Sequence, residues 1–129
     1  MTYAAPIRQI RFALGSIAGM EGLYEHPAFP DFNDDTASVV LEEAGRFANE
    51  VIAPLNRVGD REGATIENGR VRLATGFAEA YRAFVAAGWG SVTGPVSFGG
   101  QGLPHVLGLA VQEMWHGACK SLRPVRNVA

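Results

Sequence analysis

The stretch DDTASVVLEEAGRFANEVIAPL, residues 34–55, has the clearest helical pattern of the chain. Apolar side chains recur along it at spacings of three and four, which places them on one helical face. The helix is expected to run from about residue 36 to residue 53, because Pro54 pushes the residue before it out of helical geometry. Candidates for its N-cap are Asp34, Asp35 and Thr36. The predicted apolar stripe comprises Val40, Ala44, Phe47, Ala48, Val51 and Leu55.

Two segments on either side predict further helices. Residues 6–24 have an amphipathic pattern, weakened by three glycines that each cost up to about 1 kcal/mol relative to alanine. Residues 76–87 predict a second helix, and Gly88 follows in a position suited to ending it. The apolar positions expected in the first are Ile7, Ile10, Leu14, Ile17 and Leu23, and in the second Phe77, Tyr81, Phe84 and Val85.

A third helix is expected from His105 to about Trp115, and it is apolar nearly all round, which indicates burial on more than one side. Between residues 6–24 and the helix expected at residues 36–53, residues 26–35 form a loop that can hold two aromatic rings, Phe29 and Phe32, against the body. Asn68-Gly69 predicts a hairpin near residues 64–73, too small to be stable alone. The fold class is therefore all-α, a small helical bundle with one short β-hairpin.

Length and composition exclude several classes of protein. The chain has 129 residues, enough for one domain that buries roughly 65 to 70% of its unfolded surface. Its net charge of −2 and the lack of a basic cluster argue against a nucleic-acid partner. No apolar run is long enough to span a membrane. The single cysteine, Cys119, allows no internal disulfide and suggests a reducing, cytoplasmic setting.

An uncharged segment is the strongest compositional feature of the chain. No residue between Arg82 and Glu113 carries a formal charge, although Pro95, Pro104 and several glycines indicate a loop within it. An uncharged loop between apolar helices is expected to face another domain, another subunit or a ligand. The alternative is a loop buried within this same domain.

The residues that most often carry chemistry form no recognisable site. His105 and His116 are expected on one helix but about 16 Å apart, too far to share a metal, and no catalytic motif is present. The adjacent carboxylates Glu42 and Glu43 are interpreted as a solvated face. The glycine-rich residues 99–102 lack the spacing of a phosphate loop, and Cys119 is expected to be an incidental thiol in a frayed tail.

The loop carries a resemblance to a known family. Residues 95–104 read PVSFGGQGLP and resemble the P-E-x-[FY]-G-G-x-G-L loop of flavin-dependent acyl-CoA dehydrogenases. The flanking segments are similar in the same order: FANEVIAPLN at 47–56, GDREG at 59–63, GFAEAYR at 76–82 and VQEM at 111–114. Residues 3–6, with Arg11-Phe12, resemble the short N-terminal extension of one subgroup. The resemblance covers residues 3 to about 115.

This resemblance implies the N-terminal helical domain of a longer enzyme. Family members remove hydrogens from Cα and Cβ of an acyl-CoA thioester, with a glutamate base and hydride transfer to FAD. In most of the family that glutamate belongs to a C-terminal helical bundle, and a middle β-barrel holds much of the flavin. This chain contains neither, so no catalytic residue is assigned, no cofactor-binding residue is identified, and FAD is expected only in the intact enzyme.

The resemblance also implies a set of substrate-binding positions. In the family the segment around the glycine loop lines the far end of the acyl pocket, and the corresponding residues here are Ser91, Val92, Thr93 and Val96. Val96 stands where the family commonly has a glutamate, so a less polar pocket floor is expected. The polarity and length of the acyl group therefore remain open.

The domain organisation follows from these patterns. Residues 1–33 are expected to form an extension, residues 34–118 the family-like helical domain, and residues 119–129 an atypical basic tail. The family normally continues its helices at this point, so the tail suggests a truncated or frameshifted gene, or a deliberately shortened chain. The uncharged surface should then be open and favour self-association.

Three functions remain as hypotheses from the sequence. The first is a domain that forms one wall of an acyl-CoA pocket and is inactive alone. The second is a free-standing helical module for oligomerisation or interaction through the surface of residues 83–112. The third is a small binder of acyl-CoA that retains the pocket wall without the chemistry, and a stabilising shift with acyl-CoA would favour it.

Overall fold

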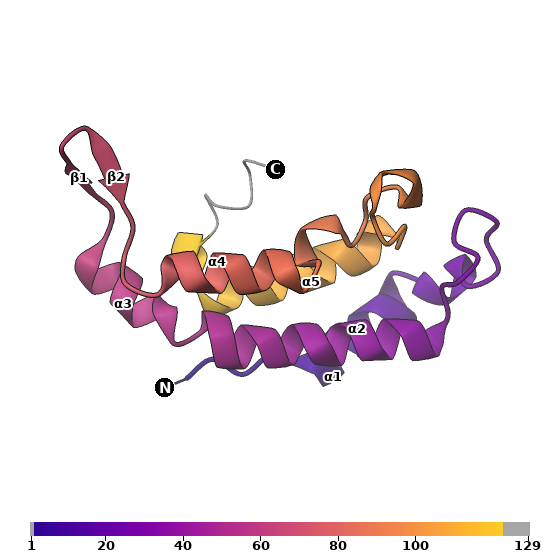
Figure 1. The fold of residues 1–129 in the computed structure, drawn as a ribbon. Helices are drawn as coiled ribbons and strands as arrows, with labels where there is room; N and C mark the ends of the chain where they lie inside the picture. The colour runs from indigo at the N-terminus through magenta and orange to yellow at the C-terminus, as the bar shows by residue number, and fades with distance from the viewer. Residues whose placement is uncertain (1, 123–129) are drawn as a thin grey trace.

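The computed structural model describes residues 2–122 and confirms a helical bundle with one two-stranded hairpin (Figure 1). Its longest helix, α2, spans Asp34–Phe47 and continues through a π-helical turn at Ala48–Ile52 up to Pro54. The N-cap is Asn33, whose Oδ1 accepts from the Thr36 amide at 2.9 Å, so the three predicted cap residues were wrong. Asn33 thus accepts from one of the free amides of the first turn, and the helix begins two residues before the predicted start at residue 36.

The buried stripe of this helix is offset from the predicted one. Ala44 and Ala48 are fully buried as predicted, but Val40, Phe47, Val51 and Leu55 are only partly buried. The innermost positions are Ala37, Leu41, Ala44, Ala48 and Ile52. Val40 and Phe47 pack against this core from its edge, so the stripe is wider than the pattern indicated.

The N-terminal segment forms a shorter helix than its pattern predicts. Helix α1 spans Ile7–Phe12 and a π-helical turn follows at Ala13–Ile17, after which Gly19 adopts φ +66° and ends the helix. A 3-10 turn at Met20–Leu23 comes next. Ile17 was expected on the apolar face but is 77% exposed.

The segment packs firmly against α2. Gly45 of α2 has no room for a side chain, since a Cβ there would lie 2.7 Å from Cδ1 of Ile7. The Ala5 amide donates to Oδ1 of Asn49 at 2.9 Å. In the following loop Phe32 is buried and Phe29 partly buried, which confirms the prediction that two rings anchor it.

Helix α3, Leu55–Glu62, leads into the hairpin, with β1 at Thr65–Glu67 and β2 at Arg70–Arg72. The strands pair antiparallel, with Ile66 opposite Val71, as the Asn-Gly turn predicts. Helix α4 then spans Phe77–Ala86 between two glycines with positive φ, Gly76 and Gly88. Phe77 and Phe84 are buried as predicted, whereas Tyr81 and Val85 are exposed.

Helix α5 spans His105–Ala118, one turn longer than predicted. It packs against α2. Its buried residues fall on one broad face, while Glu113 and His116 on the opposite face are exposed, so the prediction of burial on more than one side was wrong. Leu109, one of the apolar residues of this helix, is 63% exposed. Cys119 is buried rather than frayed, because the chain turns back toward α3 through Lys120–Leu122. The buried residues of α5 are Leu107, Gly108, Ala110, Val111, Met114, Trp115 and Ala118.

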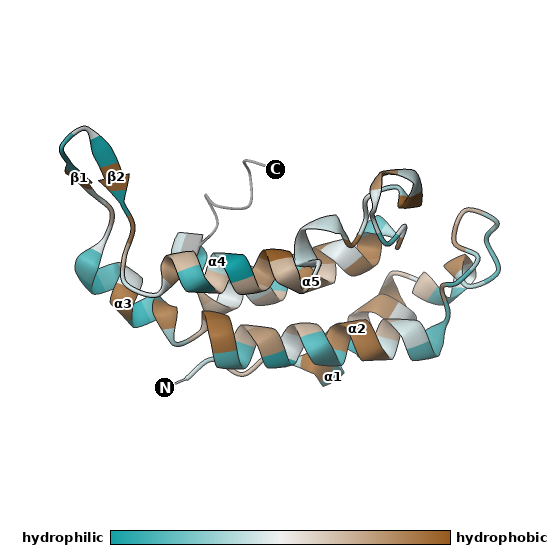
Figure 2. Ribbon diagram, viewed as in Figure 1, coloured by the Kyte–Doolittle hydropathy of each residue, from teal (hydrophilic) through white to brown (hydrophobic). Residues whose placement is uncertain are grey.

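The helices therefore form two layers, with α2 and α1 in one and α4 and α5 in the other (Figure 1). The hairpin rises from one end, and hydrophobic residues interrupt its hydrophilic colour (Figure 2). Within residues 2–122 no helix is both long and apolar enough to cross a membrane. Of the predicted basic tail, residues 123–129 lie outside the described part of the chain.

Candidate functional site

The uncharged loop after α4 is a rigid element rather than an open connection. It contains two 3-10 turns, Trp89–Ser91 and Val96–Phe98, and returns the chain to α5. Backbone bonds cross it: the amides of Gln101, Gly102 and Leu103 donate to carbonyls of Ser91, Gly94 and Val92 at 2.9 to 3.0 Å. These bonds join its outgoing and returning halves, so the loop has a fixed shape.

A glycine is required where the two halves of the loop meet. A Cβ on Gly100 would lie 2.1 Å from the Gly94 carbonyl oxygen, a contact that neither backbone could accept without moving. The Ser91 hydroxyl and the side-chain nitrogen Nε2 of Gln101 both donate to the Gly88 carbonyl, at 3.0 and 3.2 Å. The loop is therefore closed by main chain and by uncharged side chains.

The same hydrogen bonds explain why this loop does not suit a phosphate. A phosphate loop leaves backbone N–H groups free to point at the anion. Here the amides of Gly99 to Leu103 all donate to carbonyls of the loop itself. The loop thus works as a structural closure beside α5 and offers no cradle for an anion.

Aromatic rings fasten the loop to the bundle. Trp115 of α5 lies at the centre, with ring centroids 5.5 Å from Phe47, 5.9 Å from Phe84 and 5.3 Å from Trp89. These pairs are edge-to-face, the arrangement that aromatic quadrupoles favour. One residue each from α2, α4, the loop and α5 meets here, and we call Phe47, Phe84, Trp89 and Trp115 the aromatic cluster.

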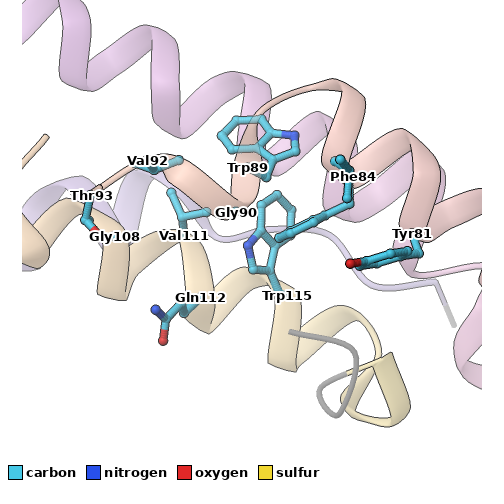
Figure 3. A pocket seen from close by; sticks show the side chains of 11 residues that line it. Tyr81, Phe84, Trp89, Gly90, Val92, Thr93, Gly108, Val111, Gln112 and Trp115 are labelled. Carbon is cyan, nitrogen blue, oxygen red and sulfur yellow. The ribbon is translucent and has the colours of Figure 1, made fainter. Parts of the chain in front are cut away.

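A cavity of about 270 Å³ opens beside this cluster, between α4, the loop and α5 (Figure 3). None of its lining side chains is charged. Val111, Gln112 and Trp115 come from α5, and Tyr81 and Phe84 from α4 (Figure 3). The lining residues are Tyr81, Phe84, Val85, Trp89, Gly90, Val92, Thr93, Gly108, Val111, Gln112 and Trp115.

One wall of the cavity is tightly packed. A Cβ on Gly108 would lie 2.6 Å from the Thr93 methyl group, so the loop can approach α5 only at a glycine. The indole nitrogen of Trp89 is buried and has no hydrogen-bond partner among the described residues. An unsatisfied buried donor costs about 1–3 kcal/mol. The cavity thus has apolar walls and, beside it, the indole N–H of Trp89, which has no acceptor among the described residues.

The predicted substrate-binding residues lie in different environments. Val92 and Thr93 line the cavity, and Val92 is buried. Ser91 faces Gly88 instead and is held by its hydroxyl. Val96 is 72% exposed and lies outside the cavity lining. The structure thus brings two of the four to the cavity, and their contact with substrate stays a prediction.

Sequence reasoning missed the contribution of α5 to this cavity. Gly108, Val111, Gln112 and Trp115 follow one another at i, i+3, i+4 and i+7, the spacing of a single helical face. The sequence pattern alone indicates only a broadly buried helix. Tyr81, predicted on the apolar side of its helix, lies at the cavity with 39% of its surface exposed.

Titratable groups with shifted pKa values lie away from the cavity. Burial raises the pKa of Tyr3, and the nearby charge of Glu113 adds to this. The pKa of Glu62 is lowered because its carboxylate accepts hydrogen bonds from the Thr75 amide and hydroxyl. Within residues 2–122 no three His, Cys, Asp or Glu side chains are grouped to hold a metal ion. Glu42 and Glu43 are exposed, as predicted.

No protein-family model matches the chain. It is 44% identical over 118 residues to a 3-methylmercaptopropionyl-CoA dehydrogenase of Ruegeria pomeroyi, a match that covers 92% of this chain. It is 29% identical over 118 residues to a broad-specificity linear acyl-CoA dehydrogenase, FadE5, of Mycobacterium tuberculosis. The chain is homologous to acyl-CoA dehydrogenases. It spans only about a fifth of the length of these acyl-CoA dehydrogenases, 20% of the first and 19% of the second.

Proposed function

We propose that the chain forms one wall of the acyl-CoA pocket of a larger, flavin-dependent acyl-CoA dehydrogenase-like enzyme and that it does not catalyse dehydrogenation alone. The uncharged cavity beside the aromatic cluster carries this proposal, since it lies in a chain homologous to acyl-CoA dehydrogenases. In this proposal residues 34–118 are the domain that builds the wall. Residues 1–33 are an extension packed on α2.

The lining of the cavity suits an acyl chain. Removing apolar surface from water contributes about 25 cal/mol per Å², and rings and aliphatic groups supply most of these walls. A charged lining side chain would lose its hydration when a hydrocarbon entered, at high cost. The cavity volume of about 270 Å³ is slightly below the roughly 300–1,000 Å³ of complete ligand pockets, as expected for one wall of a larger site.

The chemistry needs groups that this wall does not supply. Dehydrogenation between Cα and Cβ requires a base for the Cα proton and an acceptor for the Cβ hydride. None of the residues that line the cavity has a carboxylate. Glu113 follows Gln112 on α5 but lines a different groove, between α1 and α5. We therefore assign the base to the part of the larger enzyme that lies outside the match to these relatives.

The flavin is assigned to that polypeptide for a separate reason. FAD carries a pyrophosphate, which proteins usually hold with free backbone amides or basic side chains. The loop amides of Gly99 to Leu103 are used internally, and no basic side chain lines the cavity. The loop and the cavity lining therefore do not fit a flavin diphosphate, so we derive no step through FAD on this chain.

A chimera tests the proposal: this chain replaces the matching fifth of the Ruegeria pomeroyi relative. Gly90 lines the cavity and has room for a Cβ, 3.6 Å from Phe84, so Gly90→Val narrows the cavity without a backbone clash. We expect KM for the acyl-CoA to rise about tenfold, equivalent to about 1.4 kcal/mol. The chain alone should show no dehydrogenation.

Gly22→Val is the matched control, because Gly22 also lies in a 3-10 turn and has nothing within 4 Å of its Cβ position. This variant should leave KM unchanged. A chimera that folds but does not oxidise acyl-CoA would overturn the proposal. So would equal KM values for the two valine variants. Stabilisation of the isolated chain by acyl-CoA would favour the independent binder instead.

A second candidate function is an interaction or self-association module. It is favoured by apolar side chains on the uncharged surface: Phe98 is 89% exposed, Val96 72% and Leu109 63%. Sedimentation of the chain over a range of concentrations distinguishes the two. A discrete, stable oligomer supports the module, whereas a monomer or nonspecific aggregates support the pocket-wall proposal.

A further inference from the structure

The hairpin is the part of the fold least supported by the rest of the chain. It projects from one end of the bundle, beyond α3 and α4 (Figure 1). Every residue of both strands is exposed. A two-stranded ribbon without further strands or a helix against it is marginally stable in water.

The two faces of the hairpin differ in chemistry. Ile66 and Val71 are directly opposite each other in the register and share one face, with exposed fractions of 77% and 68%. The other face carries the pairs Thr65–Arg72 and Glu67–Arg70, and Arg72 forms an ion pair with Glu67 at 3.2 Å. The charged face suits water, whereas a facing pair of aliphatic side chains is what a sheet normally buries.

Only the base of the hairpin is fastened to the body. Glu62, at the end of α3, accepts from the Thr75 amide at 2.7 Å and from the Thr75 hydroxyl at 2.9 Å. We call these two hydrogen bonds the base clamp. The base clamp joins the two ends of the hairpin segment but does not touch its apolar face. The hairpin is therefore held in position while its apolar face remains exposed to solvent.

Length and charge favour a cover for the Ile66–Val71 face that comes from the rest of a larger enzyme. The acyl-CoA dehydrogenase relatives have about four fifths of their length outside the match. A second copy added edge to edge, with its β2 antiparallel to this β2 and Val71 opposite Val71, would set Arg70 opposite Arg72, and like charges directly opposite on adjacent strands are destabilising. In Figure 1 the hairpin and the uncharged loop rise on the same side of α4, at its two ends.

We propose that the hairpin is a docking arm whose Ile66–Val71 face binds the polypeptide that forms the remaining four fifths of the acyl-CoA dehydrogenase relatives. The inference rests on the proposed function, because it takes the chain to work as part of a larger enzyme. It goes beyond it by assigning a docking surface far from the cavity. The uncharged loop, at the other end of α4 and on the same side, would face the same polypeptide.

Native-state hydrogen exchange tests the arm directly. Protection factors are measured for amides 65–73 in the isolated chain and for the aligned amides in the intact Ruegeria pomeroyi relative. We expect at least about tenfold greater protection in the intact relative. Equal protection in the two proteins overturns the proposal. Protection in the isolated chain that rises with its concentration also overturns it, because a second copy would then be the partner.

Paired variants in the chimera give an independent test. Ile66→Thr with Val71→Thr should leave the Tm of the isolated chain unchanged but lower the Tm of the chimera and speed exchange in the hairpin. The matched control is Glu67→Thr with Arg70→Thr, the neighbouring cross-strand pair on the opposite face, which should change neither protein. Equal effects of the two pairs overturn the proposal.

The outcomes separate this inference from the proposed function. A chimera without dehydrogenase activity but with a protected hairpin would contradict the pocket wall and support the arm. An active chimera with an unprotected hairpin would support the pocket wall and contradict the docking arm. If the chimera does not fold, the exchange comparison with the intact relative still decides.

Discussion

The uncharged loop, residues 88–104, and the hairpin, β1–β2, both leave the helical body and return to it, yet they are held in different ways. Backbone hydrogen bonds join the two halves of the loop, and Trp89 packs against rings from two helices, Phe47 of α2 and Trp115 of α5. The hairpin has its own ladder and the base clamp of Glu62 and Thr75. The loop is continuous with the core, whereas the hairpin is attached at one end.

This difference separates two kinds of exposed apolar residue. Phe98 extends from a loop whose shape is fixed by the core, so it is presented rigidly. Ile66 and Val71 lie on an element with little support of its own, which needs a partner to become stable. Changes in the loop should therefore act on the whole fold, and changes in the hairpin should remain local.

The largest effect is expected from removing the ring that fastens the loop. Trp115→Ala takes a nearly buried side chain, 6% exposed, from the centre of the aromatic cluster and should destabilise the chain by about 3–5 kcal/mol. Urea unfolding measures this directly. Leu109→Ala, on the same helix but 63% exposed, should cost less than about 1 kcal/mol. Equal losses would show that the cluster is not part of the core.

Gly100→Ala should have the next largest effect, because its Cβ would collide with the Gly94 carbonyl and open the loop. We expect a loss of about 2–4 kcal/mol in the free energy of unfolding. Gly99→Ala is the neighbouring control: Gly99 has φ +83° but nothing within 4 Å, so only the backbone cost of about 1–2 kcal/mol applies. A Gly100→Ala variant as stable as Gly99→Ala would mean that the loop yields easily.

The same contrast explains which parts of the fold could be predicted from the sequence. The Asn68-Gly69 turn was found because local chemistry alone determines it. The helix of residues 36–53 was found because its stripe persists over several turns. The break at Gly19 was missed, since one glycine lowers helix propensity without saying where the chain will turn. Asn33 was missed as a cap because three other good caps follow it.

For the cavity, the sequence could not show contacts between residues that lie far apart in the chain. Val92 and Thr93 were indicated by the family resemblance, but Val96 lies outside because the 3-10 turn of Val96–Phe98 directs it to solvent. Trp115 contributes through rings from α2, α4 and the loop, and no local pattern encodes such meetings. The burial of Cys119 depends likewise on a return toward α3 that the sequence pattern does not show.

On the hairpin side of the comparison, Gly69→Ala should have a smaller and local effect. Gly69 has φ +75° with nothing within 4 Å of its Cβ position, so the substitution costs only about 1–2 kcal/mol of backbone strain in the turn. Exchange of the hairpin amides should quicken about tenfold while the global unfolding midpoint stays unchanged. A fall in the midpoint as large as that of Gly100→Ala would show that the hairpin is part of the cooperative core.

The smallest effect is expected from pH, and it should distinguish the two regions most cleanly. The pKa of Glu62 is lowered by its hydrogen bonds from Thr75, so the base clamp is complete above the ordinary glutamate pKa and is lost as the pH falls through the lowered value. NMR titration of the Thr75 amide should therefore show a midpoint below the ordinary glutamate pKa, with the hairpin loosening over the same interval. Residues 83–112 contain no carboxylate, so the loop amides should not move with it. Glu62→Gln should abolish the transition, whereas a Thr75 midpoint at or above the ordinary value would mean that the clamp does not hold the base of the hairpin.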